Sequence, residues 1–155
     1  MLWFDRRAFS LTEMMVAIAL VGILILIAMP KGHQLFVKSS VRAARGAVFN
    51  TAQQARAVAI SQSRRATVNL ENGTGRVFVT ASPRRGAACG GCTMDTVGAV
   101  TSLAAQHGVA LNADAASFTF DNRGLGTNPN LITIEVRREN ERDTVWVRGF
   151  GRVEK

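Results

Sequence analysis

The most constraining feature of this sequence is an uninterrupted apolar stretch near its N-terminus. Residues 14–29 carry no charged or strongly polar side chain, and Glu13 stands directly before them. A helix needs about 20 apolar residues to cross a bilayer, and the less polar part of residues 9–12 extends the stretch toward that length. A helix that is apolar all round is buried on all sides. The stretch therefore predicts a segment that lies in a membrane or in a bundle of helices.

Beyond this stretch the pattern becomes amphipathic. Pro30 lacks a backbone donor and Gly22 is conformationally permissive, so we expect the helix to kink or open at these two positions. From residue 37 to 62, small and apolar side chains recur at three- and four-residue steps, which places them on one helical face. This face consists of Val37, Val41, Ala44, Val48, Thr51, Ala55, Val58 and Gln62. The two halves together predict one helix of about 80 Å over residues 9–63, at ~1.5 Å per residue.

From residue 65 onward the signals are those of strands and turns. Residues 67–70 and 76–79 alternate around the turn residues 72–75, which predicts a β-hairpin. Residues 82–100 are rich in small residues and glycine and are expected to form a surface loop. Short strands are expected at 109–111 and 117–120, followed by a turn at 121–124. A second antiparallel hairpin, with one solvated face, is expected over 131–136 and 144–148, with its turn at 138–141.

These patterns predict an α+β fold in which a long N-terminal helix packs on a small antiparallel β-sheet head. The expected segments are a leader at 1–8, a membrane or filament-core helix at 9–30, an amphipathic helix at 31–64 and a β-rich head at 65–155. A head of this size has a modest core and limited stability on its own.

Three explanations of the N-terminal segment compete. The basic residues Arg6 and Arg7 before an apolar stretch fit a secretory signal peptide, although residues 28–31 make a poor cleavage site of the A-x-A type. A plain membrane anchor is the second explanation. The third rests on residues 6–13, Arg-Arg-Ala-Phe-Ser-Leu-Thr-Glu, directly followed by the apolar stretch. This arrangement resembles the type IV prepilin signal, and the whole chain is identified as a pilin-like protein.

The resemblance implies that a prepilin peptidase cuts between Ala8 and Phe9 and that Phe9 becomes a methylated N-terminus. Ala8 stands where the family usually has glycine. Glu13 would be the fifth residue of the mature chain and would pair with the Phe9 amine of a neighbouring subunit during filament assembly. A purely local explanation of Glu13 is also available, because Ser10 and Glu13 have the spacing of a helix capping box.

Within the superfamily, the chain resembles the branch that joins the H-type pseudopilins of type II secretion with the FimT minor pilins. Residues 118–124 and a final strand ending at 149–153 carry this resemblance. It implies either a minor type IV pilin near the pilus tip that binds extracellular DNA for uptake, or a structural minor pseudopilin without nucleic-acid binding. The implied partners are other pilin or pseudopilin subunits, the prepilin peptidase and the inner membrane, which the chain would cross once, with its head in the periplasm or outside the cell on a filament.

The charge of the chain bears on the choice between these two functions. Lys and Arg number 19 against 11 Asp and Glu, a formal net charge of +8, which indicates anionic partners and says nothing about fold. Cationic side chains of the last hairpin and tail are the candidates for contact with double-stranded DNA: Arg137, Arg138, Arg142, Arg148, Arg152 and Lys155. DNA-binding FimT proteins carry a Gly-Arg-x-Arg motif, of which residues 151–154 keep the first arginine and have Glu154 at the second. The alternative is a solvated face, since acidic residues are interleaved with the basic ones.

Two cysteines, Cys89 and Cys92, flank two glycines within the expected loop. One C-x-x-C pair cannot supply the four ligands of a structural zinc site. With the head outside the cytoplasm, a local disulfide is the default expectation, and free thiols or a metal contact between subunits remain the alternatives. The sequence predicts no enzyme, no cofactor and no metal centre, because its two histidines are isolated and no carboxylate pair or phosphate-binding glycine loop is present.

Overall fold

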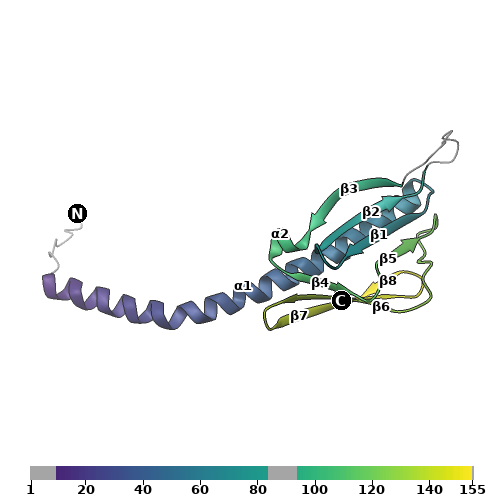
Figure 1. Cartoon of the computed structure of the whole chain (residues 1–155). Coiled ribbons are helices and arrows are strands. Elements are labelled where there is room, and N and C mark those ends of the chain that lie inside the picture. Colours follow the sequence, from purple (N-terminus) through teal and green to yellow (C-terminus); the bar gives the residue numbers. More distant parts are fainter. Residues whose placement is uncertain (1–9, 84–93, 155) are drawn as a thin grey trace, which may run out of the picture. The chain divides into compact units, whose positions relative to one another are not determined.

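The computed structural model of the chain describes residues 10–83 and 94–154, without the side chains of residues 27–30. The chain divides into two compact units, residues 1–36 and 37–155, and each is described by itself. A 51-residue helix, α1 (Leu11–Ser61), contributes to both units (Figure 1). The predicted fold class is confirmed, because a long N-terminal helix precedes a head built from antiparallel strands.

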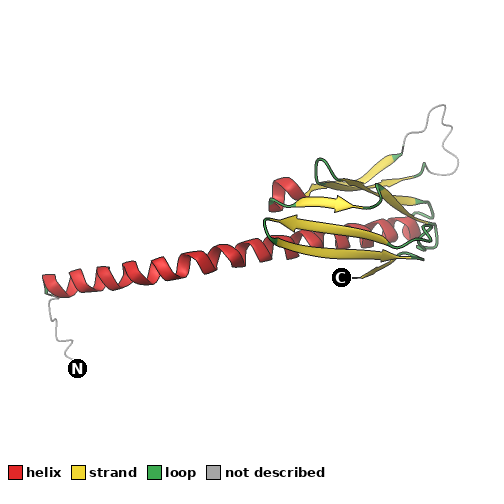
Figure 2. Cartoon of the chain, turned by 60° about the horizontal axis from the view of Figure 1, so that its bottom comes forward, coloured by secondary structure: helices red, strands yellow, loops and turns green. Residues whose placement is uncertain are grey.

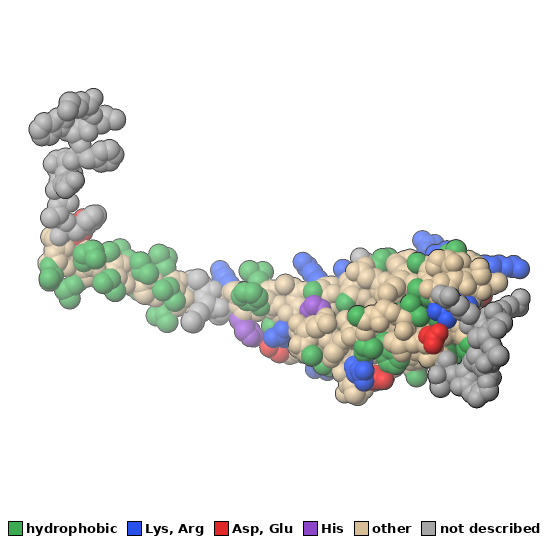
Figure 3. All heavy atoms as spheres, turned by 90° about the horizontal axis from the view of Figure 1, so that it is seen from above, with side chains coloured by type: hydrophobic (Ala, Val, Ile, Leu, Met, Phe, Trp, Pro, Cys, Tyr) green, Lys and Arg blue, Asp and Glu red, His purple; other side chains and the backbone are tan. Residues whose placement is uncertain are grey.

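In the first unit, the segment of α1 from Met14 to Leu26 is apolar all round and is exposed on all sides. Its large hydrophobic side chains between Leu11 and Leu26 are each 52% to 79% exposed, and Figure 3 shows them covering this part of the helix. Full burial of a large apolar side chain contributes about 1.5–3 kcal/mol. The helix therefore has a strong drive to bury this surface against lipid or other helices.

In the second unit, α1 buries one face against the strands. The predicted face is confirmed: Val37, Val41, Ala44, Val48, Thr51, Ala55 and Val58 are buried, and Gln62 is half-buried. Several of these residues, together with Ala52 and Ala59, are small, so strands can approach the helix closely. The strands of the head lie around this part of the helix (Figure 2).

The first sheet, named sheet A, has four strands in the order β3-β2-β1-β5. Its central hairpin joins β1 (Ala66–Glu71) to β2 (Arg76–Ala81), with Leu70 opposite Val77, so the predicted hairpin is confirmed. The strand β5 (Ser117–Phe120) pairs antiparallel with β1 and lies where a strand was expected.

The expected loop over residues 82–100 is wrong in its second half. Residues Asp95–Ser102 form β3, which pairs antiparallel with β2 at the edge of sheet A. All of its residues are exposed or half-buried, so the strand lacks the alternation that marks a strand with one buried face. Gly98, at φ +84 beside Gln54 of α1, interrupts the pattern further. Residues 84–93 of the expected loop lie outside the described residues.

A short helix, α2 (Leu103–His107), follows β3 and was not expected from the sequence. The Ser102 hydroxyl caps its start by accepting a hydrogen bond from the Ala105 N–H, and Gly108 ends it in the left-handed conformation. Leu103 is fully buried, so this helix closes one end of the core.

The second sheet, named sheet B, has four strands in the order β4-β6-β7-β8. The strand β4 (Ala110–Ala113) pairs with β6 (Ile132–Arg138), which forms the predicted hairpin with β7 (Glu141–Arg148). The expected single final strand ending at residues 149–153 is wrong. The strand β7 stops at Arg148, and a tight turn returns the chain as β8 (Arg152–Glu154) along β7. Gly151 permits this turn because it adopts φ +76.

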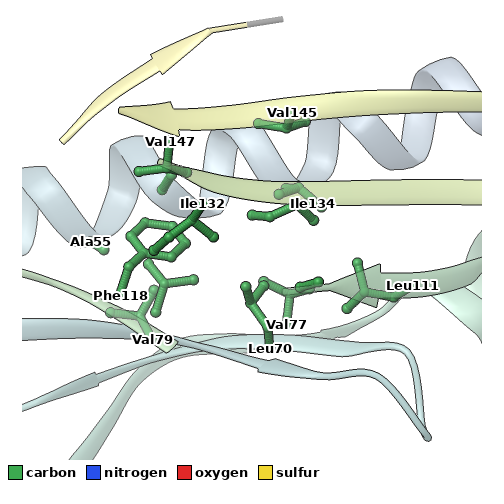
Figure 4. Close-up of a cluster of buried hydrophobic side chains, with 14 of the residues drawn as sticks. Ala55, Leu70, Val77, Val79, Leu111, Phe118, Ile132, Ile134, Val145 and Val147 are labelled. Atoms are coloured by element: carbon green, nitrogen blue, oxygen red, sulfur yellow. The ribbon is translucent and has the colours of Figure 1, made fainter. Parts of the chain in front are cut away.

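One hydrophobic cluster joins α1 to both sheets. Figure 4 shows Leu70, Val77 and Val79 of sheet A facing Ile132, Ile134, Val145 and Val147 of sheet B, with Ala55 of α1 and Phe118 beside them. The predicted turn at 121–124 is present, and the Asp121 carboxylate accepts hydrogen bonds from the Arg123 and Leu125 N–H groups. Gly126 then bridges both Phe120 and Phe150, so this connection ties the two sheets together.

Candidate functional site

The first turn of α1 holds Glu13, the residue that the sequence singles out for filament assembly. Ser10 precedes the first helical residue, and its hydroxyl accepts a hydrogen bond from the Glu13 N–H at 3.2 Å. This bond confirms the capping role expected for Ser10. Glu13 is acidic in the first turn, where a carboxylate is favoured by the helix dipole. Ala8 and Phe9 lie outside the described residues, so their cleavage and methylation stay predictions.

The length and composition of α1 bear on whether it can span a membrane. Within the described residues, no single helix is long and apolar enough to cross a membrane, whereas the bent pair Leu11–Leu26 and Lys31–Ser61 is long and apolar enough when taken together. Pro30 lies between these two segments, but its side chain lies outside the described part of the chain. Gly22 lies within α1 with nothing within 4 Å of an added Cβ. The proposed kinks at Gly22 and Pro30 stay predictions.

Four of the six basic candidates lie on one face of sheet B. Alternation along the strands turns one set of side chains to the core and the other to solvent. We call the solvent side the outer face of sheet B. Its residues are Ala110, Asn112, Thr133, Glu135, Arg137, Arg142, Thr144, Trp146, Arg148, Arg152 and Glu154.

The strand register groups these four arginines into two pairs. Arg137 of β6 lies opposite Arg142 of β7, and Arg148 of β7 lies opposite Arg152 of β8. Arg142 and Arg148 are six residues apart on one strand, which corresponds to about 20 Å at ~3.3 Å per residue. The outer face therefore carries two separate cationic positions rather than one cluster.

Glu154 compensates the second arginine pair. Its carboxylate accepts a hydrogen bond from Arg148 Nε at 2.8 Å and forms an ion pair with Arg152 Nε at 2.9 Å. The side chains of Arg148 and Arg152 are still 62% and 79% exposed. An ion pair at such an exposed position stabilises a protein by only about 0–1 kcal/mol. Both guanidinium groups can therefore exchange the Glu154 carboxylate for another anion.

The remaining two basic candidates lie elsewhere. Arg138 turns toward the core side, where its Nη1 donates to the Ser40 hydroxyl at 2.8 Å and to the His107 carbonyl at 2.9 Å. It thereby joins α1, α2 and the end of β6, and it is a structural residue in this arrangement. Lys155 lies outside the described residues.

Trp146 is the feature of this face that the sequence analysis missed. Its side chain is 39% exposed and lies on β7, a central strand of sheet B, opposite Glu154 of β8 and Thr133 of β6. The alternation of Val145, Trp146 and Val147 already placed the indole on the solvated side of the hairpin. A large aromatic ring on that side is a signal that the sequence contained.

The cysteine pair is the last of the predicted sites, and the sequence predicts no metal centre. Cys89 and Cys92 lie outside the described residues, and their disulfide stays a prediction. Among residues 10–83 and 94–154, no three His, Cys, Asp or Glu side chains lie close enough together to hold a metal ion.

Known proteins are similar to this chain in an N-terminal sequence motif and in its fold. Residues 3–29 match the family model of the prokaryotic N-terminal methylation motif. The fold is similar to that of the type IV minor pilin FimU of Pseudomonas aeruginosa, at a TM-score of 0.58 and 14% identity, covering 75% of this chain and 87% of FimU. A second crystal form of FimU gives a TM-score of 0.54 at 14% identity, covering 73% and 90%. No curated protein matches the sequence.

Proposed function

Because this chain carries the N-terminal methylation motif and the fold of the type IV pilin superfamily, we propose that it is a minor pilin subunit that assembles with related subunits into a filament. The observation that carries this proposal is the apolar half of α1. Its large side chains are 52% to 79% exposed in the isolated chain, and a membrane or a bundle of like helices would bury them. The role is structural and binding rather than catalytic.

The proposal assigns processing and assembly to the residues around the start of this helix. We expect the prepilin peptidase to cut between Ala8 and Phe9 in the inner membrane. Glu13 would then lie near the methylated amine of Phe9 on a neighbouring subunit and pair with it. An unpaired carboxylate deep in a bilayer costs about 2.5–3.5 kcal/mol, so this pairing favours insertion of the subunit into the filament. The chain would cross the membrane once, with its head in the periplasm or outside the cell, where a Cys89–Cys92 disulfide is favoured.

The test is the intact mass and N-terminal sequence of the protein recovered from native membranes. We expect an N-terminus at methylated Phe9. An N-terminus beyond Pro30 would mean that the apolar stretch is a discarded signal peptide. A protein that keeps Met1 after maturation would contradict processing by the prepilin peptidase.

For the finer role, we favour a FimT-like minor pilin near the pilus tip that binds DNA. The supporting observation is the placement of Arg137, Arg142, Arg148 and Arg152 on the outer face of sheet B. Arginines that contact phosphates release counterions, so this binding weakens steeply as salt rises. Extracellular DNA taken up by the cell would be the ligand.

Retention of the detergent-solubilised full chain on duplex DNA tests this role. We expect retention at low salt, loss of retention at high salt, and weaker retention of the Arg148→Ala/Arg152→Ala variant. Arg123→Ala, which removes an exposed arginine of the 121–124 turn, is the matched control and should leave retention unchanged.

The second candidate is a structural H-type minor pseudopilin of type II secretion without nucleic-acid binding. The observation that favours it is Glu154, whose carboxylate already pairs with both Arg148 and Arg152. Absence of retention on DNA even at low salt would support this candidate over the DNA-binding pilin.

A further inference from the structure

We propose that the outer face of sheet B binds single-stranded nucleic acid, with a base stacked on Trp146 and phosphates held by the arginine pairs on either side. This inference rests on the DNA-binding role proposed above. It goes beyond that role because it names the strandedness of the ligand, an aromatic contact and an inhibitory carboxylate.

The first observation is the position of the indole. Trp146 lies on a central strand of a four-stranded antiparallel sheet, and the residue is 39% exposed. Its closest neighbours across the strands on this face are Thr133 and Glu154, and Thr144 lies two residues along β7. In this proposal the exposed part of the indole is the surface on which a base stacks.

The second observation is the charge on either side of this ring. Arg148 lies two residues from Trp146 along β7 and Arg142 lies four residues away in the other direction, and each has a second arginine opposite it. Like charges that lie directly opposite each other destabilise a sheet. Within residues 10–83 and 94–154, Arg142 forms no ion pair that would offset this repulsion. A polyanion along the face would offset it.

The dimensions suit an extended strand. The two arginine pairs are about 20 Å apart along β7, which leaves room for several nucleotides between them. Proteins that bind single strands combine a cationic track for the backbone with aromatic rings on which bases stack. An open four-stranded sheet with aromatic residues on its face is one established form of this arrangement. Bases inside a duplex are already stacked on each other and cannot lie flat on the indole without unpairing.

Glu154 acts as a competitor for the ligand. Its carboxylate holds Arg148 at 2.8 Å and Arg152 at 2.9 Å, directly opposite Trp146. A phosphate that reaches this end of the face must replace the carboxylate and also meets its repulsion. Loss of the Glu154 charge should therefore strengthen binding, whereas it would have no such effect on a surface that binds no anion.

The experiment uses the full chain in detergent with Trp3→Phe, which leaves Trp146 as the single fluorescent tryptophan of the two in the sequence. The probes are an oligothymidine, a duplex of equal length and inorganic polyphosphate. We expect oligothymidine to quench Trp146 fluorescence and to bind more tightly than either of the other probes. Polyphosphate has charge without bases, so it isolates the electrostatic part of the binding.

Variants then separate stacking from charge. Because the variants at Trp146 keep no tryptophan in the Trp3→Phe background, the binding of every variant is measured by the fluorescence anisotropy of dye-labelled probes. Trp146→Ala should weaken oligothymidine binding by at least about 5-fold, corresponding to the ~1 kcal/mol lower bound for one stacked base, and Trp146→Phe should restore most of it. Glu154→Gln should strengthen binding several-fold and steepen its salt dependence. Arg123→Ala is the matched control and should change neither the affinity for oligothymidine nor its salt dependence. Circular dichroism of each variant confirms that the fold is kept.

The outcomes are distinct. Equal binding of all three probes, with no effect of Trp146→Ala, would overturn the stacking proposal and leave a purely electrostatic DNA surface. No binding of any probe at low salt would overturn the DNA-binding role together with this inference. Neither result would affect the assignment as a filament subunit, which depends on the mature N-terminus.

Discussion

At the scale of single residues, Gly151 combines a left-handed backbone conformation with close contacts on the side where a Cβ would lie. It adopts φ +76, and an added Cβ would lie 2.5 Å from the Phe120 Cε1 atom and 2.8 Å from the Gly126 nitrogen. The β7–β8 turn therefore depends on glycine for both its conformation and its close approach to sheet A.

We predict that Gly151→Ala lowers the free energy of unfolding by at least about 1–3 kcal/mol, the usual cost of a strained backbone position. Denaturant unfolding followed by Trp146 fluorescence measures the change. Gly73→Ala is the control, because nothing lies within 4 Å of an added Cβ at Gly73, and it should change stability much less. Equal stability of the two variants would show that the turn tolerates a side chain.

A second residue-scale prediction separates two arginines that the sequence alone treats alike. Arg138 donates hydrogen bonds to Ser40 and His107, whereas Arg142 is exposed on the outer face. Arg138→Ala should lower the free energy of unfolding by about 1–3 kcal/mol and leave DNA affinity unchanged. Arg142→Ala should lower DNA affinity and change stability by less than about 0.5 kcal/mol. Thermal unfolding and DNA retention are measured on both variants. Equal effects of the two substitutions would contradict the assignment of Arg138 to stability and of Arg142 to DNA binding.

At the scale of elements, the small residues of α1 set how closely helix and sheets approach. Ala55 is fully buried and lies beside the facing side chains of both sheets (Figure 4), whereas Ala57, two residues on, is exposed. A larger side chain at Ala55 has no space without displacement of a strand.

We predict that Ala55→Leu destabilises the head by about 1–3 kcal/mol through overpacking. Ala57→Leu adds the same side chain on the exposed face of α1. It should have little effect on stability, because alanine and leucine are both good helix formers. Chemical denaturation of the two variants measures the difference. A stability change of equal size in both would mean that helix propensity, not packing, decides the outcome.

The elements also show what the sequence could and could not reveal. The buried face of α1 and the hairpins β1–β2 and β6–β7 were predictable, because each has one clear period and one buried side. The strand β3 was not, since an edge strand exposed on most of its length has no alternation to detect. Arg138 was assigned to a turn, although its spacing from Val136 puts both on the inner side of β6.

The outer face of sheet B was only partly predictable for a related reason. The basic residues and their sequence positions were evident, but the opposition of Arg148 to Arg152 depends on the return of β8 along β7. That return is set by the glycine turn at residues 149–151. The pairing of Glu154 with both arginines follows from the register and could not be derived from the order of residues alone.

At the scale of the whole molecule, the proposed function gives the two units separate tasks, so a change in one should leave the other intact. We predict that Glu13→Gln abolishes incorporation into filaments while the head unfolds at the same denaturant concentration as before. Sheared filament fractions probed for the protein measure incorporation. The control is Glu71→Gln in the head, a half-buried residue at the β1–β2 hairpin, which should leave incorporation unchanged.

Normal incorporation of the Glu13→Gln chain would contradict a charge-pairing role for this residue. It would leave the helix cap as the function of Glu13, since glutamine at the same position also suits a capping box.

The Ser10 cap has a consequence for maturation. Ser10, whose hydroxyl caps the start of α1, lies after the proposed cut. The mature chain therefore keeps this cap when the leader is removed. The anchor would thus keep one conformation before and after proteolysis. The peptidase could then release a subunit that is already shaped for its place beside its neighbours, without a refolding step between cleavage and assembly.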